Sequence, residues 1–405
     1  MPRDVYVVEA CRTPIGRYGG GLSTIRPDDL LGDLLASTVE RCGITGSEVD
    51  EVVAGCANQA GEDNRNVARM ALLLAGFPDT VPASTVNRLC GSSMDATHVG
   101  ARTIAVGDAE VVIACGVESM SRAPLAMSKP ERAFEAGHRK VWDTTLGWRF
   151  DNDRLRARFP LESMGETAEN LVEEMSISRE DQDRFALASH QHAVMAADDG
   201  AFDSQLVPVE IRGRRGAVHL VDQDEGPRRE TDLDALGRLA AVFRDGGTVT
   251  AGNSSTLNDG AAALVLASED AVHRFGFAPM ARIRGMATAG VDPRYMGIGP
   301  VPASRTALER SGIGLEDIDV IELNEAFAAQ AIAVLRELDI DADDRTLVNP
   351  NGGAIALGHP LGCSGARILT SLLHEMRGRG AARYGLATMC IGVGQGIATV
   401  VEATE

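Results

Sequence analysis

The clearest pattern in the chain is a helix end, a short acidic turn and an apolar strand that together occur twice. The first copy, RCGITGSEVDEVV, covers residues 41–53, and the second, RSGIGLEDIDVI, covers residues 310–321. In both copies a glycine follows the last helical positions, which is typical of a helix C-terminus. Apolar residues resume after the acidic turn, so we expect each copy to lead from a helix into a buried strand.

A second pair of similar segments follows the first at nearly the same spacing. The strand AEVVIACGVES begins at Ala109, and ARYGLATMCIGVGQG begins at Ala382. Before each lies a turn rich in cysteine and glycine that opens a helix, starting near Leu89 and Gly358. Chance similarity is the alternative, but two tandem α/β halves explain both pairs. Because strands alternate with helices, we expect mainly parallel sheets.

Residues from about 123 to 247 resemble neither half. They contain an amphipathic helix pattern, ISREDQDRFALASHQHAVMAA, over residues 177–197. They also contain a basic stretch over residues 212–229, whose arginines are Arg212, Arg214, Arg215, Arg228 and Arg229. A long insertion in an α/β scaffold usually carries binding groups or contacts between subunits. We therefore expect this segment to act as a lid, a binding element or an oligomer contact.

Composition narrows the classes of partner and site. The net charge of −19 argues against nucleic acid and anionic membranes as partners. No apolar run is long enough to span a bilayer, and the first residues do not resemble a targeting segment, so we expect a cytoplasmic protein. The seven cysteines include no CxxC pair and no histidine at zinc-ligand spacing, which predicts free thiols and no metal.

Cys90 is the first candidate for a reactive thiol. It lies in STVNRLCGSSMDATHVGARTIAVG, where a helix begins at about Cys90 and small residues leave room for a bulky group. Backbone N–H groups at a helix N-terminus favour a thiolate, so we expect the pKa of this thiol to be lowered. The alternative interpretation of this position is a small buried residue with no chemistry.

Three further residues stand where strands and glycine-rich turns end. His359 lies in NPNGGAIALGHPLGCSGAR, opposite Cys90 in the repeat, which suits a base that activates a thiol. Cys390 ends the strand ATMC, and Asn324 ends the strand of VIELNEAFAAQAI. The alternatives are a packed histidine, a core cysteine and a helix-capping asparagine. GVGQG lacks the downstream helix and acidic residue of a dinucleotide loop.

Together, NRLCGSSM, the NEAFAAQ segment, GGAIALGHPLGCSGAR and MCIGVGQG resemble the active-site loops of the thiolase family. The resemblance spans essentially the whole chain. It implies two similar α/β halves in a five-layered αβαβα core, with a loop domain inserted in the first half. We expect residues 1–122 and 248–272 to form the N-terminal half, residues 123–247 the loop domain, and residues 273–405 the C-terminal half.

The resemblance also implies a role for each matching residue. Cys90 would be the nucleophile that carries the acyl group, and His359 would take its proton. Cys390 would be the second acid and base, acting at C2 of acetyl-CoA. Asn324 would hold a water that forms one oxyanion hole with His359, and the backbone N–H groups of Cys90 and Gly392 would form the other. No cofactor is implied, because coenzyme A is a substrate.

For coenzyme A, the resemblance points to Ser255 on the pantetheine arm and to Arg228 near the nucleotide, with a further contact at Met164. Some biosynthetic relatives have histidine before Met-Gly, whereas this chain has Ser163, which weakens an assignment as an acetoacetyl-CoA synthase. The resemblance implies coenzyme A and 3-ketoacyl-CoA as ligands. It also implies a homodimer or a dimer of dimers.

The acyl chain of the substrate is less clearly indicated. Segments 56–70, 116–124 and 143–150 look like those of 3-oxoadipyl-CoA thiolases, whereas CGSSM and PLGCSGAR look closer to thiolases of fatty-acid β-oxidation. We therefore favour 3-oxoadipyl-CoA and keep medium-chain 3-ketoacyl-CoA and acetoacetyl-CoA as alternatives. Arg65, Arg69 and Arg149 are candidates to bind a terminal carboxylate, although Arg69 could instead brace its own helix and Arg149 could pair with Asp151 or Asp153. A decarboxylating ketoacyl synthase and a non-catalytic acyl-CoA carrier are the rival classes.

Overall fold

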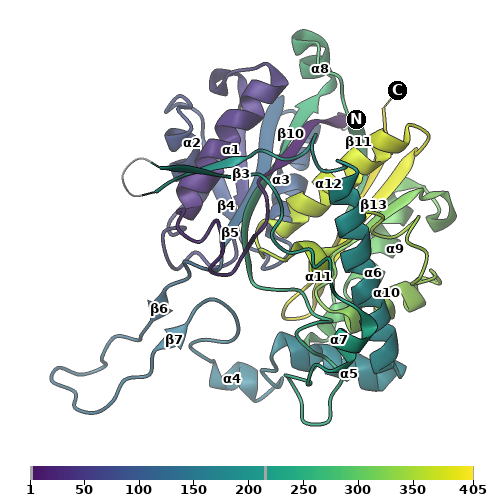
Figure 1. Ribbon diagram of the computed structural model, residues 1–405. Helices are drawn as coiled ribbons and strands as arrows, with labels where there is room; N and C mark the ends of the chain where they lie inside the picture. Colours follow the sequence, from purple (N-terminus) through teal and green to yellow (C-terminus); the bar gives the residue numbers. More distant parts are fainter. Residues whose placement is uncertain (1–2, 214–216, 405) are drawn as a thin grey trace.

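Two halves with the same order of strands form the body of the protein, which is represented by a computed structural model describing residues 3–213 and 217–404 (Figure 1). The strands of the first half are β1 (Val5–Arg12), β3 (Glu51–Gly55), β4 (Ala83–Val86), β5 (Val111–Ser119) and β10 (Asn258–Ser268). Those of the second half are β11 (Ala281–Gly290), β12 (Val320–Leu323), β13 (Tyr384–Ile391) and β14 (Gln395–Ala403). The order β12-β13-β14-β11-β1-β10-β5-β3-β4 places the two halves edge to edge, with β11 beside β1.

Strand direction corrects the expectation of mainly parallel sheets. In the first half β3, β4 and β5 are parallel to one another, but β10 lies between β5 and β1 and is antiparallel to both. In the second half β14 occupies the same place between β13 and β11, again antiparallel to both. The sequence pattern could not separate a crossover strand from one that returns antiparallel, because both are buried on two faces and read as continuous apolar runs.

The repeat seen in the sequence reappears as repeated geometry. The helix before β3 ends at Gly43 with φ +69°, and the helix before β12 ends at Gly312 with φ +68°. Asp50 accepts hydrogen bonds from two successive backbone N–H groups at the start of β5, and Asp319 does the same at β13. Equivalent residues thus perform equivalent tasks in both halves, so chance similarity is excluded.

Helices separate and cover the sheets in layers, as the resemblance implied. The central layer is α3 (Ser92–Val106) with α12 (Ser364–Arg379), and the outer layers are α1 (Pro27–Cys42) with α2 (Val67–Leu74), and α9 (Pro300–Ser311) with α10 (Ala328–Glu337). Alternate residues of one strand serve different layers, since a strand presents successive side chains to opposite faces. On β10, Leu264 packs in the cluster around α3 and α12, whereas Val265 packs with α1.

Glycines allow the two central helices to meet. A Cβ atom at Gly365, near the start of α12, would lie 2.4 Å from the backbone nitrogen of Met94 in α3. A Cβ atom at Gly116 of β5 would lie 2.3 Å from the carbonyl oxygen of Gly362. The Ser93 hydroxyl accepts a hydrogen bond of 2.8 Å from the backbone N–H of Ala366. The turns before both helices are therefore held against each other.

The segment between β5 and β10 lies partly against the body and partly away from it. It contains α5 (Met164–Met175), α6 (Arg179–Asp198), α7 (Leu233–Gly237), the pair β8 (Val209–Arg212) and β9 (Val218–Val221), and the projecting β6 (Leu125–Ala126), β7 (Trp142–Asp143) and α4 (Asp153–Arg156), seen at the lower left of Figure 1. The predicted helix over 177–197 is confirmed as α6. Arg214 and Arg215 of the basic stretch lie outside the described residues, and the boundaries 123–247 stay a prediction.

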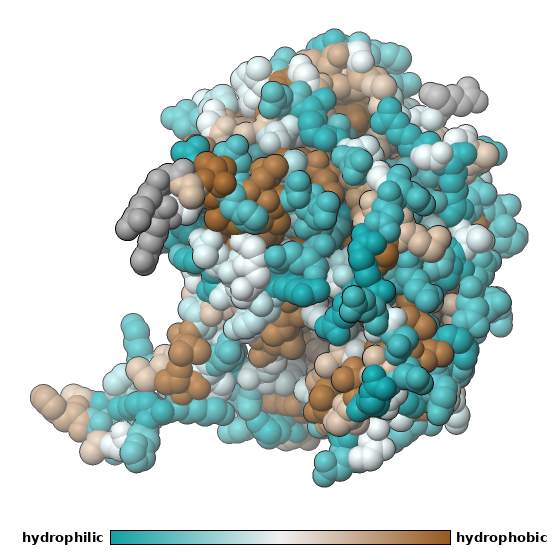
Figure 2. All heavy atoms as spheres, viewed as in Figure 1, coloured by the Kyte–Doolittle hydropathy of each residue, from teal (hydrophilic) through white to brown (hydrophobic). Residues whose placement is uncertain are grey.

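Shorter elements complete the chain: β2 (Gly16–Arg17), α8 (Glu269–Phe275), α11 (Ala354–Leu357) and short 3-10 turns. Over residues 3–213 and 217–404, no helix is long and apolar enough to cross a membrane. The face seen in Figure 2 is mixed in hydropathy, and it is hollowed between the body and the projecting segment, with hydrophobic side chains beside the hollow.

Two glycine-to-alanine substitutions in the same helix should have opposite effects on stability. Gly365→Ala forces a methyl group against the backbone of α3 and should lower the free energy of unfolding by about 1–3 kcal/mol or more. Gly378→Ala, near the exposed end of α12 with nothing within 4 Å, should raise it by a few tenths to about 1 kcal/mol. Urea unfolding of both variants checks this, and equal changes would contradict the close approach of the two helices.

Candidate active site

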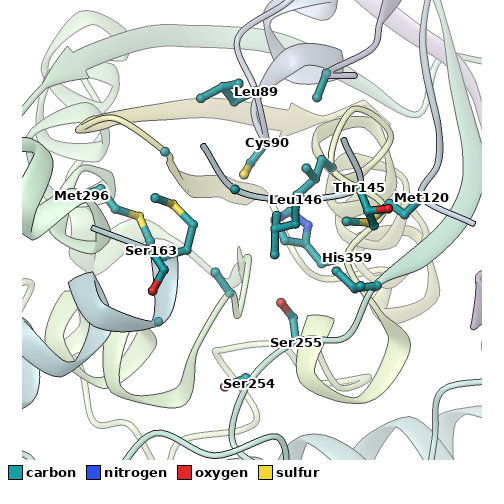
Figure 3. A pocket seen from close by; sticks show the side chains of 18 of the residues that line it. Leu89, Cys90, Met120, Thr145, Leu146, Ser163, Ser254, Ser255, Met296 and His359 are labelled. Atoms are coloured by element: carbon teal, nitrogen blue, oxygen red, sulfur yellow. The ribbon is translucent and has the colours of Figure 1, made fainter. Parts of the chain in front are cut away.

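A cavity of about 390 Å³ lies where loops from both halves meet the inserted segment. Of the residues singled out in the sequence, the following line it: Cys90, His359, Cys390, Gly392, Ser255, Ser163, Met164 and Arg149. Figure 3 shows Cys90 and His359 facing the same space, with Ser255 on another side of it. Asn324 lies buried beside His359, whereas Arg228 is exposed and does not line the cavity.

Cys90 is held in a strained turn just before α3. Leu89 has φ +46°, a conformation that a branched side chain rarely adopts. The Ser92 hydroxyl closes this turn, because it accepts a hydrogen bond from the backbone N–H of Arg88 and donates one to the carbonyl of Leu89. The strain is thus maintained by specific contacts, and it directs Cys90 into the cavity.

The expectation that the helix lowers the pKa of Cys90 is wrong. The first helical residue is Ser92, so the thiol stands before the helix rather than in its first turn. The backbone N–H groups of Gly392 and of Cys90 itself face the sulfur and favour a thiolate. Burial outweighs them and raises the pKa of Cys90 to about 11, so the resting group is a neutral thiol.

His359 is arranged to accept a proton on Nε2. Its Nδ1 lies 2.6 Å from the Ser364 hydroxyl, which also lies 3.0 Å from the carbonyl oxygen of Pro360. A carbonyl can only accept, so the hydroxyl donates to Pro360 and His359 Nδ1–H donates to the hydroxyl. Nε2 is then the unprotonated nitrogen of the ring and can accept a proton. Burial and the nearby Arg367 lower the pKa of His359 to about 3, which keeps the ring neutral.

Asn324 is oriented by a buried cation. Its Oδ1 lies 3.5 Å from the Arg367 guanidinium, and its Nδ2 lies 3.5 Å from His359 Nε2. Arg367 in turn lies 3.7 Å from the buried carboxylate of Glu322. Because an arginine can only donate, the contact with Oδ1 turns the amide nitrogen of Asn324 toward the histidine. This arrangement differs from the helix-cap alternative, since α10 begins at Ala328.

Cys390 is the second-last residue of β13 and lies near Cys90. Burial raises the pKa of Cys390 far above its ordinary value, and the nearby Cys90 raises it further. Gly392 follows in the turn between β13 and β14 and contributes the N–H that faces Cys90. The two thiols therefore share one buried space, and both are protonated near neutral pH.

The residues expected to contact coenzyme A occupy different places. Ser255 is fixed by a backbone hydrogen bond of 3.0 Å to Ala326. Met164 begins α5, whose N-terminus is capped by the Ser163 hydroxyl in a reciprocal arrangement with Glu166. The backbone N–H of Arg228 lies 3.3 Å from His190 Nδ1, on the surface rather than in the cavity. The serine before Met164 thus has a clear structural task.

Glu118 is a cavity residue that the sequence reasoning missed. Its buried carboxylate accepts hydrogen bonds from the backbone N–H groups of Ala57, Asn58 and Gly362, at 2.7–3.1 Å. It therefore ties the loop of His359 to the loop after β3. Burial raises the pKa of Glu118 to about 7. The segment GVESMSRAP was noted only for its resemblance, although a carboxylate ending an otherwise apolar strand is itself a signal.

Glu118, Cys56 and Asp63 come close enough to suggest a metal site. Asp63 receives hydrogen bonds from the backbone N–H groups of Gln59 and Gly61, and from the Cys56 thiol. The carboxylate oxygens of this cluster are thus occupied by protein donors. We assign it to holding the loop after β3.

The three arginines proposed to bind a terminal carboxylate lie in different surroundings. Arg69 donates to the carbonyls of Val81 and Asp79, so it braces its own helix end. Arg65 is exposed and does not line the cavity. Arg149 lines the cavity, and Asp151, considered as its partner, pairs with Arg156 instead.

Comparison with known proteins gives a consistent result. Residues 5–270 match the family described as thiolase, N-terminal domain, and residues 277–403 match thiolase, C-terminal domain. The chain is 57% identical to the beta-ketoadipyl-CoA thiolase of Pseudomonas aeruginosa over 99% of this chain and 100% of that protein. It is 55% identical to the 3-oxoadipyl-CoA/3-oxo-5,6-dehydrosuberyl-CoA thiolase of Escherichia coli strain K12, over 99% of each.

A solved thiolase structure has the same fold. The fold superposes on human mitochondrial 3-ketoacyl-CoA thiolase in complex with CoA with a TM-score of 0.91 and 42% identity, over 99% of this chain and 98% of that one.

Alkylation should report the raised pKa of Cys90. With a pKa of about 11, the thiolate fraction of Cys90 should rise about tenfold per pH unit between pH 7 and pH 10. The rate of modification by iodoacetamide, followed at the Cys90 peptide by mass spectrometry, should rise in parallel. A rate that is already constant at pH 7 would mean that the resting enzyme holds a thiolate, contrary to the effect of burial.

Proposed function

The chain belongs to the thiolase family, and we propose that it cleaves 3-oxoadipyl-CoA with coenzyme A to acetyl-CoA and a four-carbon dicarboxylic acyl-CoA, and that it can run the reverse condensation. The observation that carries this proposal is one cavity that Cys90, His359 and Cys390 all line. The identity above 50% to proteins named for this substrate supports the choice of acyl chain.

In the first half-reaction, we propose that the Cys90 sulfur attacks the C3 ketone while His359 Nε2 takes the thiol proton. This transfer lets a thiol of high pKa act as a nucleophile, because the base is in place and neutral. The C2–C3 bond then breaks, and its electron pair goes to C2 of the departing acetyl-CoA. Cys390, kept protonated by burial, supplies the proton to C2. Cys90 remains as a thioester of the shortened acyl chain.

The second half-reaction reverses these proton movements. The thiol of free coenzyme A gives its proton to the Cys390 thiolate and attacks the thioester carbonyl. The Cys90 thiolate leaves and recovers its proton from His359. A ping-pong sequence through acyl-Cys90 follows, and every group returns to its starting state.

Two sets of donors suit the oxygens that become negative. The backbone N–H groups of Cys90 and Gly392 face the nucleophile, where an oxyanion on the attacked carbon would form. The amide nitrogen of Asn324, beside His359, suits the thioester oxygen of the enolate, directly or through a water. Removal of one such donor typically costs about 3–4 kcal/mol of transition-state stabilisation.

For coenzyme A, we propose that Ser255 and Met164 contact the pantetheine arm and that Arg228, at the surface, lies toward the nucleotide. An acidic protein needs local cations to bind phosphates, and Arg228 has no ion-pair partner among the described residues. No cofactor enters the scheme, because coenzyme A is a substrate.

Two further expectations remain proposals. We propose that residues 123–247 act as the lid and the oligomer contact of a homodimer or a dimer of dimers. We also propose a cytoplasmic location.

Medium-chain 3-ketoacyl-CoA and acetoacetyl-CoA remain the alternative substrates. The arrangement argues against the two rival classes, because a ketoacyl synthase would have a second histidine where Asn324 stands, and an inert carrier would not need the oriented His359.

The roles of the two cysteines can be separated. After incubation with acetyl-CoA, mass spectrometry should place the acetyl group on Cys90 alone. Cys390→Ser should keep this acylation but lower the rate of thiolysis by at least about 10²-fold, because a serine hydroxyl is a much poorer acid and base. Acetylation confined to another cysteine, or a near wild-type rate in Cys390→Ser, contradicts the assignment.

Substrate preference tests the acyl chain. Steady-state thiolysis of 3-oxoadipyl-CoA, 3-oxohexanoyl-CoA and acetoacetyl-CoA should give at least a tenfold higher kcat/KM for 3-oxoadipyl-CoA, since a paired carboxylate adds about 1.5–3 kcal/mol. Equal kcat/KM values for 3-oxoadipyl-CoA and 3-oxohexanoyl-CoA would assign the enzyme to fatty-acid substrates instead.

A further inference from the structure

Arg149 is the single lysine or arginine among the described residues that line the catalytic cavity. It lies in the loop between β7 and α4 and is half-buried. The cavity is otherwise lined mainly by apolar and small polar side chains. A lone cation in such a wall is expensive to bury, so it requires a partner.

The protein supplies Arg149 with only weak partners. Its guanidinium approaches the carbonyl oxygen of Thr144 at 3.3 Å and that of Asn58 at 3.5 Å, both near the long limit for a hydrogen bond. Within the described residues no carboxylate lies within ion-pair distance of it. A guanidinium has five N–H donors, so Arg149 retains donors for a ligand.

The two acidic residues of the cavity wall are otherwise engaged. Glu118 accepts three backbone N–H groups, as described above. Glu162 binds Arg294 at 3.3 Å and the Asn170 amide at 3.1 Å. The chain has a net charge of −19 and is rich in carboxylates. Even so, neither of these two cavity acids pairs with Arg149. The arrangement is that of a cation kept for an anionic ligand.

We propose that Arg149 determines specificity by binding the terminal carboxylate of the acyl chain. This inference rests on the proposed function, which provides a substrate with a carboxylate two methylene groups beyond the C3 ketone. The planar fork of arginine matches a carboxylate with two parallel hydrogen bonds, and the main-chain contacts at Thr144 and Asn58 preset its orientation.

The same ion pair protects the acyl-enzyme. The succinyl group on Cys90 carries its carboxylate within reach of its own thioester carbon. Attack by that oxygen would close a five-membered anhydride ring and expel the Cys90 thiolate, and water would then open the ring to free succinate and two protons, one of which returns Cys90 to the thiol. Proximity makes such intramolecular attack fast. A carboxylate held by Arg149 is withdrawn from this reaction, so the acyl group passes to coenzyme A.

The test compares Arg149→Gln and Arg149→Lys with wild type on 3-oxoadipyl-CoA and 3-oxohexanoyl-CoA. Arg149→Gln should lower the ratio of the two kcat/KM values by about 10–100-fold, through loss of a charged hydrogen-bonded contact. Arg149→Lys should restore part of the ratio. In Arg149→Gln, more free succinate should form per acetyl-CoA released, measured by chromatography of both products.

Arg154→Gln is the matched control, because Arg154 is an exposed arginine of the neighbouring helix α4 that does not line the cavity. It should leave the ratio and the succinate yield as in wild type. If Arg149→Gln lowers kcat/KM equally for both substrates, Arg149 only braces its loop and the inference is wrong. If wild type prefers 3-oxoadipyl-CoA and Arg149→Gln keeps that preference, the inference fails while the proposed function stands. Absence of any preference in wild type rejects the substrate assignment itself.

Discussion

The structure depends on the close contact between the N-terminal turns of the two central helices. The turn before α3 carries Cys90 and the turn before α12 carries His359, and each comes from a different half of the chain. Gly116, Gly362 and Gly365 allow backbone to approach backbone there, and Ser93 bonds across the junction. Any side chain at these glycines would push the turn of Cys90 away from the turn of His359.

This contact also buries the chemistry. Burial disfavours the charged forms of the reactive groups, so it raises the pKa values of both thiols and lowers that of His359. The two thiols and the His359 ring are therefore neutral at rest, and in the proposed mechanism they become charged only when a proton moves from Cys90 to His359. In the same proposed mechanism, the oriented donors around Gly392 and Asn324 stabilise the charge that develops on the substrate.

Polar networks hold the reactive groups in one arrangement. Ser364 fixes the tautomer of His359, Arg367 fixes the amide of Asn324, and Glu118 ties the histidine loop to the loop after β3. Glu325 acts similarly one layer away, where its buried carboxylate binds Arg345, Ser189 and Asn349. The inserted segment adds the wall that contains Arg149, so under the proposal above substrate selection and catalysis are supplied by different parts of the chain.

Much of this could be predicted from the sequence, because local patterns carry local physics. The repeated glycine cap and acidic turn identified two equivalent halves, since a left-handed residue and a strand-capping aspartate are needed wherever that connection occurs. The glycine-rich turns around Cys90, His359 and Cys390 marked the loops that meet in the cavity. Helix α6 was visible from its amphipathic period.

Other features were decided only by tertiary structure, because they depend on what surrounds a residue rather than on its neighbours in sequence. The antiparallel course of β10 and β14 is set by sheet order, which an apolar run does not encode. The pKa of Cys90 is set by burial, which overrides the local effect of the helix start. The distinction between Arg69, which braces its own helix end, and Arg149, which faces the cavity, required the positions of carbonyls and carboxylates far away in the chain.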